Sequence, residues 1–338
     1  MSTLDWKNLG FGYTTTDYNA RCYFKDCKWG EIEYTNSEYV NMHIAATCLH
    51  YGQEAFEGLK AYRCKDGKIR LFRIADNAQR MAETAKYIMM EPIPQDIFIE
   101  AVTNVVKKNE KFIPPYGSGA SLYIRPLLIG VGPEIGVKPS KEYLFMVLVT
   151  PVGPYFKEGF SPANIMICRD YDRAAPLGTG HIKVGGNYAA SLLSLKKGVE
   201  LGYASVLYLD SREKKYIDEC GQTNFFAIKG NTYITPESRS VLPSITNKSL
   251  MALAEDMGMK IERRRIPFEE LATFDEAGSC GTAAVISPIR KIVDPDNNRI
   301  YEYCKDGKPG PYCEKLYNKL LAIQYGEEPD THGWVTVL

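Results

Sequence analysis

The residue of this chain best suited to chemistry is a lysine that stands among glycines. Lys183 lies in the stretch Leu177-Gly178-Thr179-Gly180-His181-Ile182-Lys183-Val184-Gly185-Gly186-Asn187-Tyr188. Because Ile182 and Val184 can supply an apolar wall, the amine can lose its proton and become a nucleophile. The glycines would let the backbone approach a flat ring. The segment therefore favours a lysine that forms an imine with a carbonyl cofactor, while a surface lysine on a glycine-rich loop explains this segment alone equally well.

A carboxylate further along the chain favours the first interpretation. Glu219 lies in Tyr216-Ile217-Asp218-Glu219-Cys220-Gly221, so it can end a strand with its side chain in a pocket. A carboxylate beside a pyridine nitrogen favours the protonated ring, which is the better electron sink. The alternative is an exposed glutamate in a turn. Together, Lys183 and Glu219 suggest pyridoxal 5'-phosphate as the cofactor and transamination as the reaction.

Two segments of small residues could bind the phosphate of such a cofactor. The first, Pro243-Ser244-Ile245-Thr246-Asn247-Lys248-Ser249, leads into an amphipathic helix whose free N–H groups would bind an anion. The second, Gly278-Ser279-Cys280-Gly281-Thr282-Ala283-Ala284, reads as a turn that could wrap oxygens. Arg80 could add a charge-assisted contact, although most helix arginines are simply solvated.

A third glycine-rich segment nearly matches a dinucleotide-binding fingerprint but fails it. Gly130-Val131-Gly132-Pro133-Glu134-Ile135-Gly136 has the wrong spacing and contains a proline. The following Val137-Lys138-Pro139 cannot open the helix that the fingerprint requires. We therefore exclude a Rossmann site here.

Hydrophobic periodicity predicts the elements that must position these residues. We expect a helix capped by Asp76 and running to Ala85, and further helices over 94–111, 188–201 and 245–257. Strands are expected over 68–73, 121–125, 143–149 (stopped by Pro151), 165–168, 204–209, 224–228 and 232–235. Lys229-Gly230-Asn231 joins the last two strands as a hairpin.

The length of the chain and a segment rich in turn-forming residues predict two domains with a mixed α+β fold. A single core rarely extends over 338 residues. The segment from Pro151 to Pro162 is dense in turn-forming residues and is the best candidate for a linker. We expect a small N-terminal α+β domain over 1–153, a linker over 154–165, and a larger C-terminal domain over 166–338 that carries the cofactor lysine.

Composition limits the partners. Acidic and basic residues balance at 41 each, so the sequence predicts no nucleic-acid or membrane partner. The 9 cysteines have no C-x-x-C spacing and the 4 histidines form no H-E-x-x-H motif, so no metal site is expected. The N-terminus has no apolar signal core, and the run from Tyr143 to Val149 is too short to cross a bilayer. We expect a soluble, cytoplasmic enzyme.

Taken together, these segments resemble the branched-chain amino acid aminotransferases, which belong to the fold-type IV class of pyridoxal-phosphate enzymes. The resemblance runs from about Phe11 to Leu321. It is carried by several separate segments: Leu49-His50-Tyr51-Gly52, Phe56-Glu57-Gly58, Tyr123-Ile124-Arg125-Pro126, Pro151-Val152-Gly153-Pro154-Tyr155-Phe156, Lys183-Val184-Gly185-Gly186-Asn187-Tyr188, Glu219-Cys220-Gly221 with Asn224, and Gly281-Thr282-Ala283-Ala284. It implies a two-domain fold with pyridoxal 5'-phosphate between the domains.

The resemblance also implies a role for each site residue. Lys183 would form the Schiff base and then move the proton between the substrate α-carbon and the cofactor. Glu219 would pair with the ring nitrogen, and Tyr188 would hydrogen-bond the phenolic oxygen. The phosphate would be bound by Arg80, Ile245, Thr246 and Thr282. Thr282 and Ala283 would also receive the substrate α-carboxylate. The side-chain pocket would be lined by Tyr51, Phe56, Tyr123 and Tyr155, with Arg125 receiving the distal carboxylate of glutamate.

The implied substrates are leucine, isoleucine or valine together with 2-oxoglutarate, in ping-pong kinetics. The implied assembly is a homodimer in which the loop at Ile135 and Val137 reaches the partner's pocket. Two departures stand out. Ala284 and Ser287 occupy the positions of a C-x-x-C redox switch in vertebrate relatives, so that switch should be absent. Gln222 stands where some relatives have a small hydroxyl residue, which leaves that substrate contact open.

Three alternatives remain open at this stage. A D-amino acid aminotransferase and an aminodeoxychorismate lyase share the fold and would use the same Lys183 and Glu219. Phe56-Glu57-Gly58 and the long segment from Val152 to Phe156 favour the branched-chain enzyme. The third alternative, a non-catalytic small-molecule binding module, is weakened by the balanced charge and by the absence of a DNA-reading motif.

Overall fold

The structure, a computed structural model, describes residues 4–6, 8–153 and 160–338. The chain divides into two compact units. The first comprises residues 1–157, 182–185 and 322–338, and the second comprises residues 158–181 and 186–321. The predicted two-domain boundary differs from this division in two places, because the segments 182–185 and 322–338 group with the N-terminal part. The first part of the predicted linker lies outside the described residues, and Ala163 to Ile165 belong to a strand.

The first unit is built on a nine-stranded sheet in which every paired neighbour is antiparallel. The order of the strands is β18-β6-β5-β7-β8-β1-β2, with β3 paired to β1 and β4 paired to β7. Their bounds are β1 (Asn19–Lys25), β2 (Lys28–Trp29), β3 (Glu33–Thr35), β4 (Glu54–Phe56), β5 (Leu59–Arg63), β6 (Ile69–Phe72), β7 (Ser121–Gly130), β8 (Tyr143–Val152) and β18 (Val335–Val337).

The predicted stop at Pro151 is wrong. β8 continues to Val152, and Pro151 lies opposite Leu122 in the ladder with β7. A proline only removes one N–H donor, so it is tolerated close to the end of a strand.

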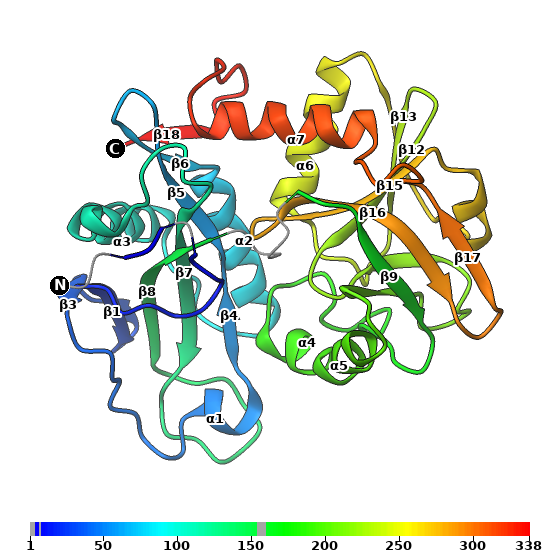
Figure 1. The fold of residues 1–338 in the computed structure, drawn as a ribbon. Helices are drawn as coiled ribbons and strands as arrows, with labels where there is room; N and C mark the ends of the chain where they lie inside the picture. Colours follow the sequence, from blue (N-terminus) through cyan, green and yellow to red (C-terminus); the bar gives the residue numbers. More distant parts are fainter. Residues whose placement is uncertain (1–3, 7, 154–159) are drawn as a thin grey trace. The chain divides into compact units, whose positions relative to one another are not determined.

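Two helices pack together against this sheet (Figure 1). The helical elements of the first unit are α1 (Thr47–Tyr51), α2 (Ile74–Tyr87), α3 (Gln95–Lys108) and the short 3-10 helix η1 (Glu110–Phe112). Fully buried Phe98, Val102 and Val105 of α3 join Phe145 of β8 in the core. Their 3.6-residue spacing in the sequence is the reason α3 could be predicted.

The predicted cap of α2 is also wrong. The helix begins at Ile74, and its N-cap is Arg73, whose φ of 54° is left-handed. Asp76 lies within the first turn and accepts a hydrogen bond of 2.9 Å from Nε of Arg73. An acidic residue anywhere in the first turn interacts favourably with the positive end of the helix dipole. Asp76 therefore indicates that a helix begins nearby, but it does not identify the N-cap residue.

The second unit contains a nine-stranded mixed sheet. The order is β11-β10-β9-β16-β15-β12-β13-β14, with β17 paired to β16. The pairs β9–β10, β9–β16 and β13–β14 are parallel. The bounds are β9 (Ala163–Cys168), β10 (Ser205–Leu209), β11 (Ile217–Cys220), β12 (Asn224–Lys229), β13 (Thr232–Pro236), β14 (Lys260–Arg264), β15 (Glu276–Gly281), β16 (Val285–Asp294) and β17 (Arg299–Glu302). The hairpin predicted at Lys229-Gly230-Asn231 is confirmed, with Gly230 at a φ of 55°.

The remaining helices of the chain are α4 (Gly185–Ala189), α5 (Leu192–Glu200), α6 (Ile245–Asp256), the 3-10 helix η2 (Phe268–Thr273) and α7 (Pro311–Gln324). The single helix predicted over 188–201 is two helices, α4 and α5. Oγ of Ser191 donates 2.8 Å to the carbonyl of Tyr188 at the break. Serine side chains that bind nearby backbone in this way compete with helix continuation.

The predicted fold class, mixed α and β, is confirmed by these two sheets with their helices. None of the helices within the described ranges is long and apolar enough to span a membrane.

Candidate active site

Backbone contacts fix the segment that carries Lys183 within the first unit. The backbone N–H of Lys183 donates 3.2 Å to Oγ1 of Thr84 in α2. Its carbonyl accepts 3.1 Å from the backbone N–H of Phe56 at the end of β4. Two residues later, the N–H of Gly185 donates to the side chain of Glu54. The lysine is thus held by its backbone on both sides, which leaves its side chain to be placed by what surrounds it.

The amine of Lys183 lies against an aromatic ring. Its Nζ is 4.7 Å from the ring centroid of Phe56, a distance at which a cation is attracted to the ring face. The neighbouring Ile182 and Val184 are buried, as predicted from their apolar character. The half-buried lysine therefore has an apolar neighbour on both sides and a ring beside its amine.

The same ring of Phe56 faces a second cation, Arg125, whose guanidinium carbon is 4.8 Å from the centroid. Nη2 of Arg125 donates 3.0 Å to the hydroxyl of Tyr123. Nε of Arg125 is buried and has no acceptor among the described residues. A buried guanidinium N–H without an acceptor is costly unless a ligand supplies one.

A glycine makes room for the ring of Tyr123. A Cβ placed on Gly58 would lie 2.2 Å from the hydroxyl oxygen of Tyr123, so a side chain at this position would displace the ring. Phe11 packs edge-on against Tyr123 with ring centroids 5.2 Å apart. Of the predicted pocket residues in the first unit, Phe56, Tyr123 and Arg125 form one connected group with Lys183.

Arg80 is held by an acid. Its Nε and Nη2 each donate 2.7 Å to the two carboxylate oxygens of Glu57, and Asn77 donates 2.7 Å to the same carboxylate. Glu57 is fully buried. The ion pair orients Arg80 from within the fold. The proposed phosphate contact of Arg80 stays a prediction.

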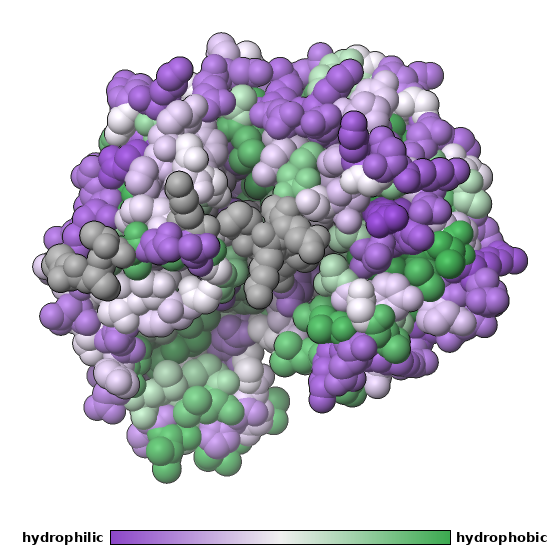
Figure 2. Space-filling model, in the orientation of Figure 1, coloured by the Kyte–Doolittle hydropathy of each residue, from purple (hydrophilic) through white to green (hydrophobic). Residues whose placement is uncertain are grey.

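Tyr51 and the loop at Ile135 and Val137 lie together at the α1 end of the first unit. The hydroxyl of Tyr51 donates to the carbonyl of Ile135. Tyr51, Ile135 and Val137 are all exposed, Val137 by 88%. Figure 2 shows hydrophobic side chains gathered over this end of the unit. We call this surface the α1 patch; it comprises Ile44, Leu49, Tyr51, Ile135 and Val137. Tyr155, the other predicted pocket residue, lies outside the described residues.

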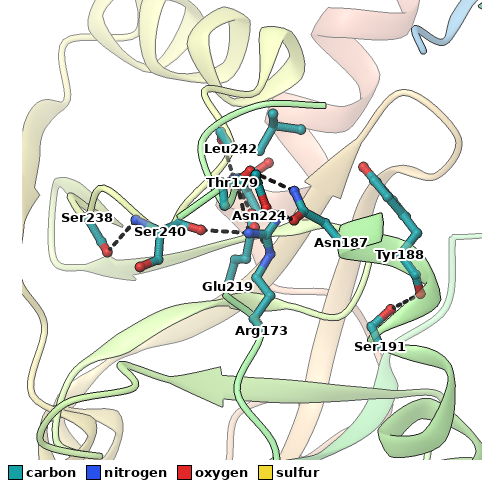
Figure 3. A network of polar contacts seen from close by, with 11 residues as sticks. Arg173, Thr179, Asn187, Tyr188, Ser191, Glu219, Asn224, Ser238, Ser240 and Leu242 are labelled. Carbon is teal, nitrogen blue, oxygen red and sulfur yellow. Dashed lines mark hydrogen bonds and ion pairs between the residues drawn. The ribbon is translucent and has the colours of Figure 1, made fainter. Parts of the chain in front are cut away.

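In the second unit, Glu219 is buried on β11 (Figure 3). Only 3% of the residue is exposed. Its Oε2 accepts 2.9 Å from Nδ2 of Asn224, and its Oε1 forms an ion pair with Nε of Arg173. Burial raises the pKa of Glu219 to about 7, against the opposing effect of the Arg173 charge. Arg173 and Asn224 thus each contact one carboxylate oxygen, and an ionised carboxylate has lone-pair sites for further donors.

The sequence analysis did not identify Arg173 as a site residue. Besides its ion pair with Glu219, its Nη1 donates 2.9 Å to the carbonyl of Gly180 and 2.6 Å to the carbonyl of Ser240. Arg173 lies ten residues before Lys183, among other charged residues. No sequence pattern there distinguishes it from a solvent-exposed arginine. Only the fold reveals that it is buried.

The glycine-rich stretch before Lys183 is tied to α4. Oγ1 of Thr179 donates 2.6 Å to Oδ1 of Asn187, whose Nδ2 donates 2.7 Å to the carbonyl of Thr179. Tyr188 follows on α4 and is half-buried. The reciprocal pair of Thr179 and Asn187 is visible in Figure 3. It fixes the start of the helix that carries Tyr188.

The predicted phosphate residues Ile245 and Thr246 form the first turn of α6, and both are buried. Oγ of Ser244 caps the helix by accepting 3.1 Å from the N–H of Asn247. The start of an α-helix presents N–H groups and a positive dipole end, both of which suit a phosphate. The sequence predicted this helix start correctly.

The second predicted turn is shorter than expected, because Gly278 to Gly281 belong to β15. The turn consists of Thr282, Ala283 and Ala284 and is followed by Val285 at a φ of 62°. A β-branched residue in the left-handed region costs on the order of 1–3 kcal/mol, and such strain gathers at functional turns.

The chain also has a buried lysine that the sequence analysis did not single out. Lys60 on β5 is 7% exposed, and burial lowers its pKa to about 8. Nothing in the local sequence marked it, because Lys60 follows Leu59 in an ordinary strand pattern. A lysine with a lowered pKa is a candidate nucleophile in its own right.

These residues define a class of protein. The first unit offers a half-buried lysine with apolar neighbours. The second unit offers a buried carboxylate and a capped helix start. An amine of this kind can condense with the aldehyde of pyridoxal 5'-phosphate, and a carboxylate and a helix start are groups that bind a ring nitrogen and a phosphate. The residues of each unit, taken separately, therefore favour the class of pyridoxal-phosphate enzymes.

Comparisons with known proteins agree. Residues 54–292 match the family described as Amino-transferase class IV. The branched-chain-amino-acid aminotransferase of Haemophilus influenzae is 48% identical, covering 99% of this chain and 99% of its own. That of Helicobacter pylori is 46% identical, covering 99% and 98%. A solved branched-chain amino acid aminotransferase from Escherichia coli has a TM-score of 0.74 at 27% identity, covering 95% of this chain and 98% of that one.

The chain belongs to the class IV aminotransferases and, within them, to the branched-chain-amino-acid aminotransferases. It is therefore an enzyme, and its cofactor is pyridoxal 5'-phosphate. The resemblance drawn from the sequence motifs is confirmed.

Proposed function

We propose that this protein transfers the amino group of L-leucine, L-isoleucine or L-valine to 2-oxoglutarate, releasing the branched 2-oxo acid and L-glutamate. The relatives named for this activity cover nearly the whole chain. The observation that carries the proposal is the contact of Lys183 and Arg125 with the same ring of Phe56, because it joins the reactive amine to a pocket that is both aromatic and cationic.

The pocket accounts for the two kinds of substrate. Aromatic walls at Phe56 and Tyr123 accept branched alkyl groups by apolar contact. The buried Nε of Arg125, which has no acceptor among the described residues, is available to the distal carboxylate of glutamate. Tyr51 and Tyr155 are proposed to complete the wall. Because both substrates use one site in turn, the kinetics should be ping-pong.

Pyridoxal 5'-phosphate, when bound, supplies an aldehyde that condenses with amines and a ring that withdraws electrons. Glu219 would hold a proton at the ring nitrogen, and Tyr188 would donate to the phenolic oxygen. The first turn of α6 at Ile245 and Thr246, together with Arg80 and Thr282, would bind the phosphate.

Lys183 has the second chemical task. Its amine would act as the general base that takes the proton from the substrate α-carbon, and as the general acid that gives the proton back. The backbone contacts of Lys183 with Thr84 and Phe56 support this role, because they fix the Cα from which the amine must reach. Thr282 and Ala283 bind the α-carboxylate in the strained turn before Val285.

The α1 patch supports a homodimer. Exposed Ile44, Leu49, Ile135 and Val137 form an apolar surface of the kind that a partner subunit covers. We propose that the loop at Ile135 and Val137 reaches the partner's pocket. The nine cysteines, all free thiols, support a reducing compartment and hence the cytoplasm.

The test is a substrate panel. Purified enzyme is assayed with L-leucine, L-isoleucine, L-valine and D-alanine, each with 2-oxoglutarate, while the absorbance of the bound cofactor is followed. Activity on the three L-substrates is expected. Activity on D-alanine alone would instead support a D-amino acid aminotransferase, and a colourless protein that never retains the cofactor would support a binding module.

A further inference from the structure

Arg173 brings a full positive charge to the buried carboxylate of Glu219. The side chain of Arg173 is 6% exposed and that of Glu219 is 4% exposed, so water screens neither. Nε of Arg173 forms the ion pair with Oε1 of Glu219. Asn224, which also donates to this carboxylate, is an amide and carries no charge. Arg173 is therefore the cation that balances Glu219 within the second unit.

The guanidinium is itself fixed at its other end. Nη1 donates to the carbonyls of Gly180 and Ser240 at 2.9 and 2.6 Å. Gly180 has no room for a side chain, since a Cβ there would lie 2.3 Å from the carbonyl oxygen of Ser240. Figure 3 shows Arg173 beside Glu219, with its hydrogen bond to Ser240 as a dashed line. Because the guanidinium is planar and rigid, holding Nη1 with two carbonyls also fixes the direction of its Nε–H group.

Two opposing effects determine whether Glu219 is ionised. Burial alone disfavours an ionised carboxylate, and a nearby opposite charge restores it. If Glu219 were neutral, it could no longer favour a protonated ring nitrogen. The electron sink on which α-proton removal depends would then weaken.

We propose that Arg173 is a positioning residue that keeps the Glu219 carboxylate ionised and aimed at the ring nitrogen of the cofactor. The inference rests on the proposed role of Glu219. Arg173 touches neither substrate nor cofactor in this account, and it acts through Glu219 alone.

The test measures the ring nitrogen directly. The holoenzyme is prepared with pyridoxal 5'-phosphate labelled with ¹⁵N in the ring, and the nitrogen resonance is recorded at neutral pH. The unmodified protein should show a protonated ring nitrogen. Arg173→Gln keeps a donor for the two carbonyls but removes the charge, so the resonance should move to the unprotonated position. Arg173→Lys keeps a charge and should retain the protonated resonance.

A matched control is available in the same unit. Nη2 of Arg169 binds Asp294 at 2.8 Å, and Asp294 is fully buried. Arg169→Gln thus breaks a comparable ion pair away from Glu219 and should leave the resonance unchanged. Single-turnover removal of the α-proton of L-leucine should slow by at least about tenfold in Arg173→Gln but not in Arg169→Gln.

The outcomes separate the two claims. A resonance in Arg173→Gln that matches the unmodified protein, while Glu219→Gln moves it, overturns the role of Arg173 and leaves that of Glu219 intact. A resonance unmoved in Glu219→Gln overturns the proposed role of Glu219 and this inference with it. An unmodified protein that does not retain the cofactor contradicts the proposed function.

One measurement does not depend on how any Arg173 variant folds. With ¹³C-labelled glutamate, the side-chain carboxyl resonance of Glu219 is assigned in the holoenzyme by its absence from Glu219→Gln. The proposal expects the position of an ionised carboxylate at neutral pH. The position of a protonated acid would overturn it.

Discussion

Glu219 places a carboxylate where almost no water reaches it, and this has a consequence for the cofactor-free protein. The pKa of Glu219 is raised to about 7, so the folded state holds the proton more tightly than the unfolded state does. The stability that this proton contributes is present below the ordinary pKa of glutamate and is lost as the pH rises through the folded-state value. Burial raises the pKa of the neighbouring Asp218 to about 6, which acts in the same direction.

We therefore predict that Glu219→Gln weakens the pH dependence of the free energy of unfolding. Urea titrations of the cofactor-free protein at about pH 5.5 and about pH 8 provide the measurement. The unmodified protein should lose more stability between these values than the variant does. Glu255→Gln, at an exposed position on α6, should behave like the unmodified protein. Equal losses in the unmodified protein and Glu219→Gln would show that Glu219 is not buried as described.

Arg80 has two roles in this account, and a double variant separates them. Arg80→Ala should weaken cofactor retention and also destabilise the fold by about 3–5 kcal/mol, because it leaves Glu57 buried without its cation. Arg80→Ala combined with Glu57→Gln removes the unpaired charge and should recover much of the stability, but not the cofactor. Melting curves and cofactor retention on dialysis report the two effects. Retention at the unmodified level in the double variant would refute the phosphate contact.

The residues recognised from the sequence were those with unusual neighbours. Lys183 stood out because glycines surround it, and Glu219 because it ends a strand. Arg173 and Lys60 did not, since burial gives each its significance and local sequence does not reveal burial. Prediction thus found the chemistry but missed the buried charges that tune it.

At the scale of elements, the link between β4 and β5 sets the shape of the pocket. Gly58 lies there, and the hydroxyl of Tyr123 fills the space that a side chain would need. Gly58→Ala should displace Tyr123 and raise the KM for L-leucine by at least about tenfold, with the cofactor still bound. Gly30→Ala is the matched control, because the nearest atom to its added Cβ is an ordinary contact at 3.5 Å. An unaltered KM in Gly58→Ala would remove Tyr123 from the pocket.

The boundaries of elements were predicted less well than their existence. α2, α3 and α6 and the strands β6 to β10, β12 and β13 follow from apolar periodicity, whereas β1 to β5, β14 to β18 and α7 were not predicted. The errors arise where one local interaction overrides the pattern: Arg73 rather than Asp76 caps α2, β8 continues past Pro151, and the hydroxyl of Ser191 coincides with the break between α4 and α5. Each of these three boundaries depends on local interactions of one residue, and hydrophobic periodicity carries no information about such interactions.

At the scale of the whole molecule, the assignment of the last residues to the first unit could not be read from the sequence. β18, near the C-terminus, pairs with β6 in the N-terminal sheet. Such long-range pairing leaves no local signature. The balanced charge, by contrast, argued against a nucleic-acid partner from composition alone.

The proposed dimer predicts the effect of a charge in the α1 patch. Val137→Glu places a carboxylate on a surface that a second subunit should cover, and it should shift the protein towards monomer and reduce activity. Sedimentation velocity measures the first effect. Ile300→Glu, at another exposed apolar residue, should sediment like the unmodified protein. A Val137→Glu protein that sediments unchanged would place the dimer interface elsewhere.

The most direct measurement identifies the amine that bonds to the cofactor. The protein is mixed with pyridoxal 5'-phosphate, reduced with borohydride, digested and mapped by mass spectrometry. Lys60, a buried lysine whose pKa is lowered by burial, is the natural competitor. We expect the pyridoxyl mass on the peptide containing Lys183, and its disappearance in Lys183→Ala. A label on Lys60 in the unmodified protein, or one that persists in Lys183→Ala, would contradict the account.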